Sequence, residues 1–158
     1  MGQFEAEIFL DRMPVTVSNF IDMAVSGLYN DLPINRDIPS RIECTGIGGP
    51  SDGMFRNLKT GCMEFRWNGG QILNEFTSRD SNEAGTLSKE TSDLLNTGGS
   101  RFFINVTHNR FMDWFLPGDL RGQSHIVFGQ ITKGRDVFEA ITVAPTEPMM
   151  INSITIRM

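Results

Sequence analysis

The pattern of apolar and polar residues predicts several strands in this chain. From residue 4 to residue 10 every second residue is apolar, which is typical of a strand with one buried face. Segments 125–131 and 150–156 are rich in apolar and β-branched residues and predict two further strands. Between residues 46 and 70 the chain is rich in glycine and its periodicity is weak, so we expect mostly loop there.

Apolar residues at helical spacing predict two helices. The first begins near Pro14, because proline suits the first turn of a helix, and it ends before Gly27. The second covers residues 136–141 and follows Gly134, which breaks the preceding strand. The residues expected to face inward are Val17, Phe20, Ile21 and Ala24 in the first helix and Val137, Ala140 and Ile141 in the second.

Two well-separated helices among many short strands indicate a mainly β protein. The pattern favours a closed or nearly closed antiparallel barrel with helices over its open ends. The chain has 158 residues, no internal repeat and no linker, so we expect residues 1–158 to form one domain.

The segment 100–107 holds the most informative side chain. With a period of two, Phe102 and Ile104 line one face of a strand, which we expect to be the core, whereas Phe103 lies on the other face between Arg101 and Asn105. An apolar ring among polar groups is typical of a binding site for a partly apolar ligand. A second buried layer or a covering loop explains the ring equally well.

Composition excludes several classes of function. The net charge of −5, with 14 Lys and Arg residues, argues against broad nucleic-acid binding, which needs a basic surface. Cys44 and Cys62 form no C-x-x-C pair and the chain has only two histidines, so we expect neither a disulfide nor a structural metal. No signal peptide or transmembrane run is visible, so we expect a soluble cytoplasmic protein with no membrane partner.

Three short sequence patterns that could belong to catalytic sites give only weak evidence for them. Residues 46–49, Gly-Ile-Gly-Gly, lack the Gly-Lys-Ser/Thr of a phosphate-binding loop. Ser100 combined with His125 lacks the second glycine of a hydrolase nucleophile elbow. Arg36 beside Asp37, taken alone, fits a surface ion pair.

Five motifs in a fixed order carry more information. Residues 13–20 read Met-Pro-Val-Thr-Val-Ser-Asn-Phe, residues 34–39 read Ile-Asn-Arg-Asp-Ile-Pro, and residues 85–88 read Gly-Thr-Leu-Ser. Residues 96–104 read Asn-Thr-Gly-Gly-Ser-Arg-Phe-Phe-Ile, and residues 125–129 read His-Ile-Val-Phe-Gly ahead of Gly-Arg-Asp-Val at 134–137. This series resembles the P-x-T-x-x-N-F, F-H-R-x-I-P, G-x-L-S, N-T-N-G-S-Q-F-F-I and H-x-V-F-G motifs of the cyclophilin-type peptidyl-prolyl cis-trans isomerases.

The resemblance implies a fold, an activity and site residues. The fold would be an eight-stranded antiparallel closed barrel capped by two α-helices, and the activity would be isomerisation of X-Pro bonds in proteins, assisting folding or switching. Arg36 matches the family's catalytic arginine, Phe103 its proline-facing ring and His125 its pocket-edge histidine. The expected partners are proline-containing peptides or proteins bound by a monomer, and no cofactor or general base is required.

Several pocket positions depart from the family pattern. Arg41 stands where the family usually has phenylalanine, Ile42 where it has methionine, and Cys44 and Arg101 where it has glutamines. Residues 89–92 correspond to the family's M-A-N-A segment. The loss of the glutamine at Cys44 predicts weaker substrate binding than in a typical cyclophilin.

Because of an insertion at residues 114–124, two alignments with the family motifs are possible at the end of the pocket. In the first, Phe111 and Met112 replace the family's W-L before its aspartate, so the indole N–H is absent and cyclosporin is expected to bind weakly. In the second, the insertion moves upstream and Asp119 with Leu120 comes near the pocket.

The altered pocket supports two further pairs of alternatives. The three arginines 36, 41 and 101 predict a locally positive groove that favours carboxylate or phosphate near proline, unless Arg41 and Arg101 pair with acids such as Glu43. The chain is either an isomerase, which we favour because Arg36 and Phe103 are retained, or a catalytically weak cyclophilin-like domain that binds a protein partner. Apolar residues 114–117 would supply the interaction surface in the second case.

Overall fold

Short antiparallel strands make up most of the regular structure. The computed structural model describes residues 2–34, 41–43, 55–56, 63–64, 72–90, 99–117, 124–143 and 149–158, and for 41–43, 55–56 and 63–64 it describes the backbone alone. The main sheet has five strands in the order β1-β8-β6-β7-β3. Their bounds are β1 Glu5–Ile8, β8 Ile126–Lys133, β6 Thr86–Lys89, β7 Phe102–Asn105 and β3 Arg41–Glu43.

Two strand pairs accompany this sheet. β2 (Leu32–Ile34) pairs with β9 (Met149–Ile151), and β4 (Phe55–Arg56) pairs with β5 (Met63–Glu64) inside the glycine-rich stretch. Among the described residues these strands form three separate sheets. The mainly β architecture with two helices is therefore confirmed, whereas closure into an eight-stranded barrel stays a prediction.

The predicted C-terminal strand is too long. β9 ends at Ile151, which pairs with Leu32, the first residue of its partner β2, and residues 152–158 form no strand. A strand exists only where a neighbour supplies backbone partners, and the alternation of apolar residues after Ile151 cannot replace one. Ile154 and Ile156 still pack against the core.

The first helix, α1 (Pro14–Val25), is confirmed at both ends. Met13 makes no side-chain cap, and the Glu75 carboxylate instead accepts hydrogen bonds from the backbone N–H groups of Val15 and Thr16 at 3.1 and 2.9 Å. A negative charge at this position also complements the helix dipole. Gly27 ends the helix at φ +77°, a conformation that costs other residues more than glycine.

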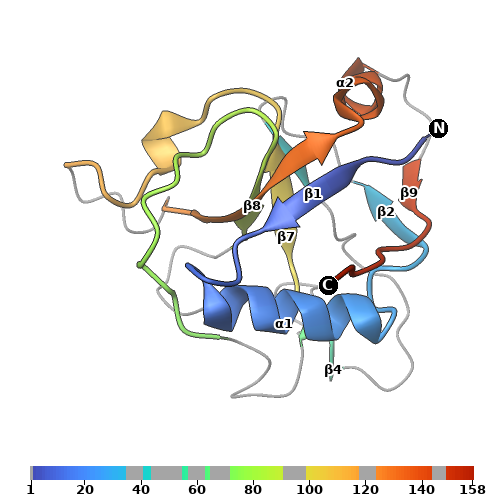
Figure 1. Ribbon diagram of the computed structural model, residues 1–158, viewed down its shortest axis with the longest axis horizontal. Helices are drawn as coiled ribbons and strands as arrows, with labels where there is room; N and C mark the ends of the chain where they lie inside the picture. The colour runs from blue at the N-terminus through green and yellow to red at the C-terminus, as the bar shows by residue number, and fades with distance from the viewer. Residues whose placement is uncertain are drawn as a thin grey trace.

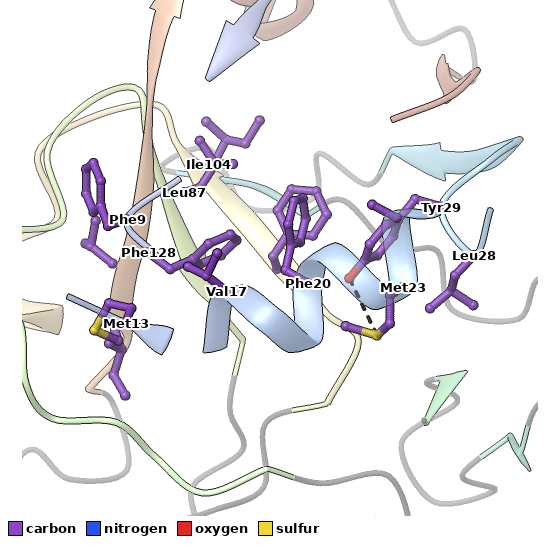
Figure 2. Close-up of a cluster of buried hydrophobic side chains, with 14 of the residues drawn as sticks. Phe9, Met13, Val17, Phe20, Met23, Leu28, Tyr29, Leu87, Ile104 and Phe128 are labelled. Carbon is purple, nitrogen blue, oxygen red and sulfur yellow. Dashed lines mark hydrogen bonds between the residues drawn. The ribbon is translucent and has the colours of Figure 1, made fainter. Parts of the chain in front are cut away.

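The core lies between α1 and the main sheet (Figure 1). Phe20 on α1 packs against Tyr29, Phe102 and Phe128, with ring centroids 5.4, 5.3 and 5.1 Å apart. Figure 2 shows Tyr29 turned toward Met23, and its hydroxyl donates to the Ser100 carbonyl oxygen at 2.7 Å. The aromatic rings thus fix the helix against β7 and β8, and the buried hydroxyl has a partner.

The second helix, α2 (Arg135–Val143), lies at the other end of the strands (Figure 1). Phe138 and Ile141 are its buried residues and Val137 is partly buried, but Ala140 is exposed, so the prediction that Ala140 faces inward is wrong. The larger ring at Phe138, which contacts Phe4, sets the buried face of the helix. Gly134 precedes α2 at φ +74°, and a Cβ there would lie 2.6 Å from the Gln3 carbonyl oxygen.

The part of the chain that the structure describes contains no helix long and apolar enough to cross a membrane.

Candidate active site

The side chains of β7 lie on the two faces of the strand as predicted. Phe102 and Ile104 belong to the hydrophobic core, whereas Phe103 is absent from that cluster and lies on the opposite face. Phe103 has no exposed surface, so the ring is covered as completely as a core residue. The polar residues Ser88 and Asn105 on the same face are also fully buried.

Phe103 is paired with the predicted pocket-edge histidine. The His125 ring stands perpendicular to the Phe103 ring, with centroids 5.0 Å apart, which is the edge-to-face arrangement that aromatic rings favour. Nδ1 of His125 lies 3.2 Å from the Lys89 carbonyl oxygen. Because a carbonyl oxygen only accepts, Nδ1 must carry the proton that this hydrogen bond uses.

The structure also brings Met112 to this place. The short 3-10 helix η1 (Arg110–Met112) ends at Met112, whose carbonyl oxygen accepts a hydrogen bond from the His125 backbone N–H at 3.0 Å. Met112 is buried, and Phe111 beside it is half exposed. This contact favours the alignment that puts 111–112 at the pocket, whereas Asp119 and Leu120 lie outside the described residues.

Strand β3 carries two more of the predicted site residues next to β7. The register pairs Arg41 with Asn105, Ile42 with Ile104 and Glu43 with Phe103. The backbone of β3 is thus adjacent to the Phe103 strand, and Ile42 lies opposite a core position of β7. The roles of Arg41 and Ile42 as pocket side chains stay predictions.

Three further site residues complete the predicted set. Arg101 precedes β7 and is partly buried, and its carbonyl oxygen accepts a hydrogen bond from the Glu90 N–H at 3.0 Å. Arg36 and Cys44 lie outside the described residues, in the segments that flank β3. Phe103, His125 and Met112 are therefore the predicted residues that the structure shows together.

A buried lysine was missed by the sequence reasoning. Lys89 is 2% exposed, and its Nζ lies 3.3 and 3.2 Å from the carbonyl oxygens of Ile72 and Leu73 and 3.4 Å from Oδ1 of Asn74. Burial lowers the pKa of Lys89 to about 8, although the Glu75 carboxylate partly opposes this shift. A signal was present: Lys89 is two residues beyond Leu87 and therefore shares its core face.

Trp114, the first residue of the predicted apolar interaction surface, makes its contacts inside the protein. Trp114 packs against Phe76 and Phe115 with ring centroids 5.2 and 5.8 Å apart, and its Nε1 donates to the Ser78 carbonyl oxygen at 2.8 Å. These contacts hold the segment after η1 against residues 76–78. Trp114 thus has a structural role inside the protein.

Comparison with known proteins gives the family. Residues 1–158 match the family model of the cyclophilin type peptidyl-prolyl cis-trans isomerases. The chain belongs to this family. The cyclophilin is 31% identical to peptidyl-prolyl cis-trans isomerase A of Dickeya dadantii, over 92% of this chain and 69% of that protein. It is 30% identical to peptidyl-prolyl cis-trans isomerase B of Escherichia coli, over 98% of this chain and 94% of that protein.

A solved structure shows the same fold. It is a crystal structure of a cyclophilin type peptidyl-prolyl cis-trans isomerase from Cryptosporidium parvum in the presence of the dipeptide Ala-Pro. The TM-score is 0.76 at 20% sequence identity, covering 99% of this cyclophilin and 94% of that chain. The family match gives the reaction of the present protein, which is peptidyl-prolyl cis-trans isomerisation.

Proposed function

We propose that this cyclophilin isomerises X-Pro bonds in proteins as a monomer, with Phe103 under the proline ring and Arg36 as the donor to the prolyl nitrogen. The observation that carries this proposal is the position of His125, which contacts the Phe103 ring and the backbone of Met112 where the family motifs predict a pocket.

The chemistry requires little of the protein. Rotation about the X-Pro bond breaks amide resonance and faces a barrier of about 18 to 20 kcal/mol. At the twisted transition state the prolyl nitrogen gains a lone pair, so a donor aimed at it binds the transition state better than the ground state. The Arg36 guanidinium suits this part because it stays protonated and donates in fixed directions. A thousandfold acceleration needs about 4 kcal/mol, which a few hydrogen bonds and a proline pocket supply.

Binding of proline at Phe103 requires a local movement. Phe103 has no exposed surface, and the His125 ring contacts it edge-on. A proline ring reaches Phe103 only when side chains around the Phe103 ring shift. Side-chain rearrangements of this kind are common when small ligands or partners bind.

The altered pocket is expected to prefer acidic residues near proline. We expect short Glu-Pro peptides to be isomerised about fivefold faster than Lys-Pro peptides at low salt, because an arginine near a carboxylate contributes up to about 1 kcal/mol when partly solvated. The measurement is NMR exchange spectroscopy of each peptide with catalytic amounts of the native protein, at low and high salt. The preference should shrink at high salt and in Arg101→Gln, which restores the family's residue.

The same experiment tests the proposed function itself. An acceleration of either peptide over buffer supports the enzyme, and its absence leaves only a binding role. Equal acceleration of Glu-Pro and Lys-Pro at low salt would show that Arg41 and Arg101 are neutralised by neighbouring acids. The two results are independent, because the first compares the protein with buffer and the second compares two peptides.

We also expect cyclosporin to bind weakly. Phe111 offers no N–H where the family's tryptophan has one, and the loss of one hydrogen bond weakens binding about tenfold. Phe111 is 52% exposed, so Phe111→Trp should be accommodated without disturbing the core. Isothermal titration calorimetry should show about tenfold tighter binding to Phe111→Trp than to the native protein. Tight binding to the native protein would contradict the assignment of Phe111.

A further inference from the structure

A buried polar cluster supports the face of the sheet on which Phe103 lies. Ser88 on β6 is the register partner of Phe103 on β7, and Asn105 is the next residue of β7 on the same face. Asn105 Nδ2 lies 3.0 Å from Ser88 Oγ and 2.9 Å from Thr86 Oγ1. These side chains are buried, so their positions are set by the hydrogen bonds among them and not by solvent.

Asn82 joins this cluster to His125. Its Oδ1 accepts from Ser88 Oγ at 2.7 Å and from Asn105 Nδ2 at 3.4 Å, and its Nδ2 donates to the His125 carbonyl oxygen at 3.2 Å. Nδ2 also donates to Oδ1 of Asp113 at 2.9 Å. Asn82 has no exposed surface, and its amide uses both donors and both acceptor sites within the protein.

The orientation of the Asn82 amide is determined by Asp113. Oδ1 of Asp113 accepts from the Asn82 backbone N–H at 2.8 Å as well as from Nδ2, and Oδ2 accepts from Ser81 Oγ at 2.5 Å. An ionised carboxylate only accepts, so Nδ2 must point toward Asp113 and Oδ1 toward Ser88. The amide therefore has one orientation, and it presents a donor to His125 and an acceptor to the strand partner of Phe103.

We propose that Asn82 is a positioning residue for isomerisation and that it sets the separation of Phe103 and His125. The Asn82 side chain hydrogen-bonds to the backbone of His125 and to the side chain of Ser88, which lies opposite Phe103. This inference rests on the proposed function, since it matters for catalysis only if proline binds against Phe103. A misplacement of about 1 Å in a supporting element can cost catalysis up to about a hundredfold.

The test compares two variants within the same polar cluster. Asn82→Ala removes the link between Ser88 and His125, whereas Thr86→Val removes a hydroxyl that contacts Asn105 but not Asn82. We expect Asn82→Ala to lower kcat/KM for a short X-Pro peptide about tenfold and to shift the His125 ring proton resonances, which lie in the ring-current field of Phe103. Thr86→Val should change kcat/KM less than twofold and leave those resonances in place.

The remaining controls distinguish a loss of stability from a failure of the Asn82 positioning role and from a failure of the proposed isomerase function. Both variants are assayed well below their melting temperatures, and Ile141→Ala on the distant helix α2 shows what loss of stability alone does. Asn82→Ser is the milder substitution and should have the same effects to a smaller extent, so the test stands even if Asn82→Ala folds poorly. Native activity that is lost in Phe103→Ala but kept in Asn82→Ala, with unmoved His125 resonances, would overturn the positioning role alone. A native protein without activity would overturn the proposed function instead.

Discussion

Substitution of Arg36 by alanine should reduce isomerisation about a hundredfold while peptide affinity changes little. The proposed donor acts on a lone pair that exists only in the twisted state, so its removal raises the barrier without weakening the ground-state complex. Removal of one preorganised donor from an active site typically costs about 3 to 4 kcal/mol, or a factor of about 10² to 10³. NMR exchange spectroscopy of an X-Pro peptide measures the rate, and chemical-shift titration measures the affinity.

Two controls define what Arg36 contributes. Arg36→Lys keeps the positive charge but replaces the planar fork with a rotating point charge, and it should recover only part of the activity. Arg110→Ala removes an arginine from η1 that is exposed, and it should leave the rate unchanged. Activity of Arg36→Ala within twofold of the native rate would show that the rotation is catalysed without this donor, by binding of the proline ring alone.

The local pattern of apolar and polar residues was sufficient to predict a strand or helix where one of its faces meets the core. The period of two in β7 correctly put Phe102 and Ile104 inward and Phe103 on the other face, because a strand has only two faces and the core takes one. Helix α1 was predicted at both ends because Pro14 and Gly27 each act through their own backbone. Helix α2 was less well defined, because small Ala140 and large Phe138 compete for the buried face and only packing decides between them.

The candidate site depends on pairings that local pattern does not contain. Phe103 meets His125 because β6 lies between β7 and β8, so two strand registers together bring the two residues to the same place. The family motifs predicted this meeting through resemblance, and the structure shows its geometry. The role of Asn82 was not predicted, because an asparagine before a glycine turn is ordinary loop sequence until its four hydrogen-bond partners are known.

The burial of Lys89 shows a second limit to what the sequence pattern can predict. Alternation puts Lys89 on the core face, opposite Phe102, yet a lysine is rarely buried without partners. Its partners are the carbonyl oxygens of Ile72 and Leu73 and the side chain of Asn74, from a segment with no regular structure. Since that segment leads directly to Glu75, which caps α1, the lysine links the sheet to the helix end.

The stability of the protein should rise with pH above about 8 because of Lys89. Its pKa is about 8 in the folded state and near the ordinary 10.5 in the unfolded chain, so between these values the unfolded state binds more protons. Stability then increases with pH, and the increase is complete above the unfolded value. From pH 7 to pH 10 we expect the native protein to gain about 2 to 3 kcal/mol in the free energy of unfolding relative to Lys89→Met.

Comparison with Lys89→Met at each pH isolates this effect, because every other titrating group is common to the two proteins. The difference in the free energy of unfolding at a single pH does not show whether Lys89 titrates. Methionine removes a buried charge but also leaves the carbonyl oxygens of Ile72 and Leu73 without a donor. Urea unfolding at a series of pH values gives the free energies, and Lys133→Met supplies the baseline for loss of an exposed ammonium group. A difference between native protein and Lys89→Met that stays constant from pH 7 to pH 10 would show that Lys89 keeps its proton throughout. In that case its three hydrogen bonds to the 72–74 segment, and not titration, would determine its contribution to stability.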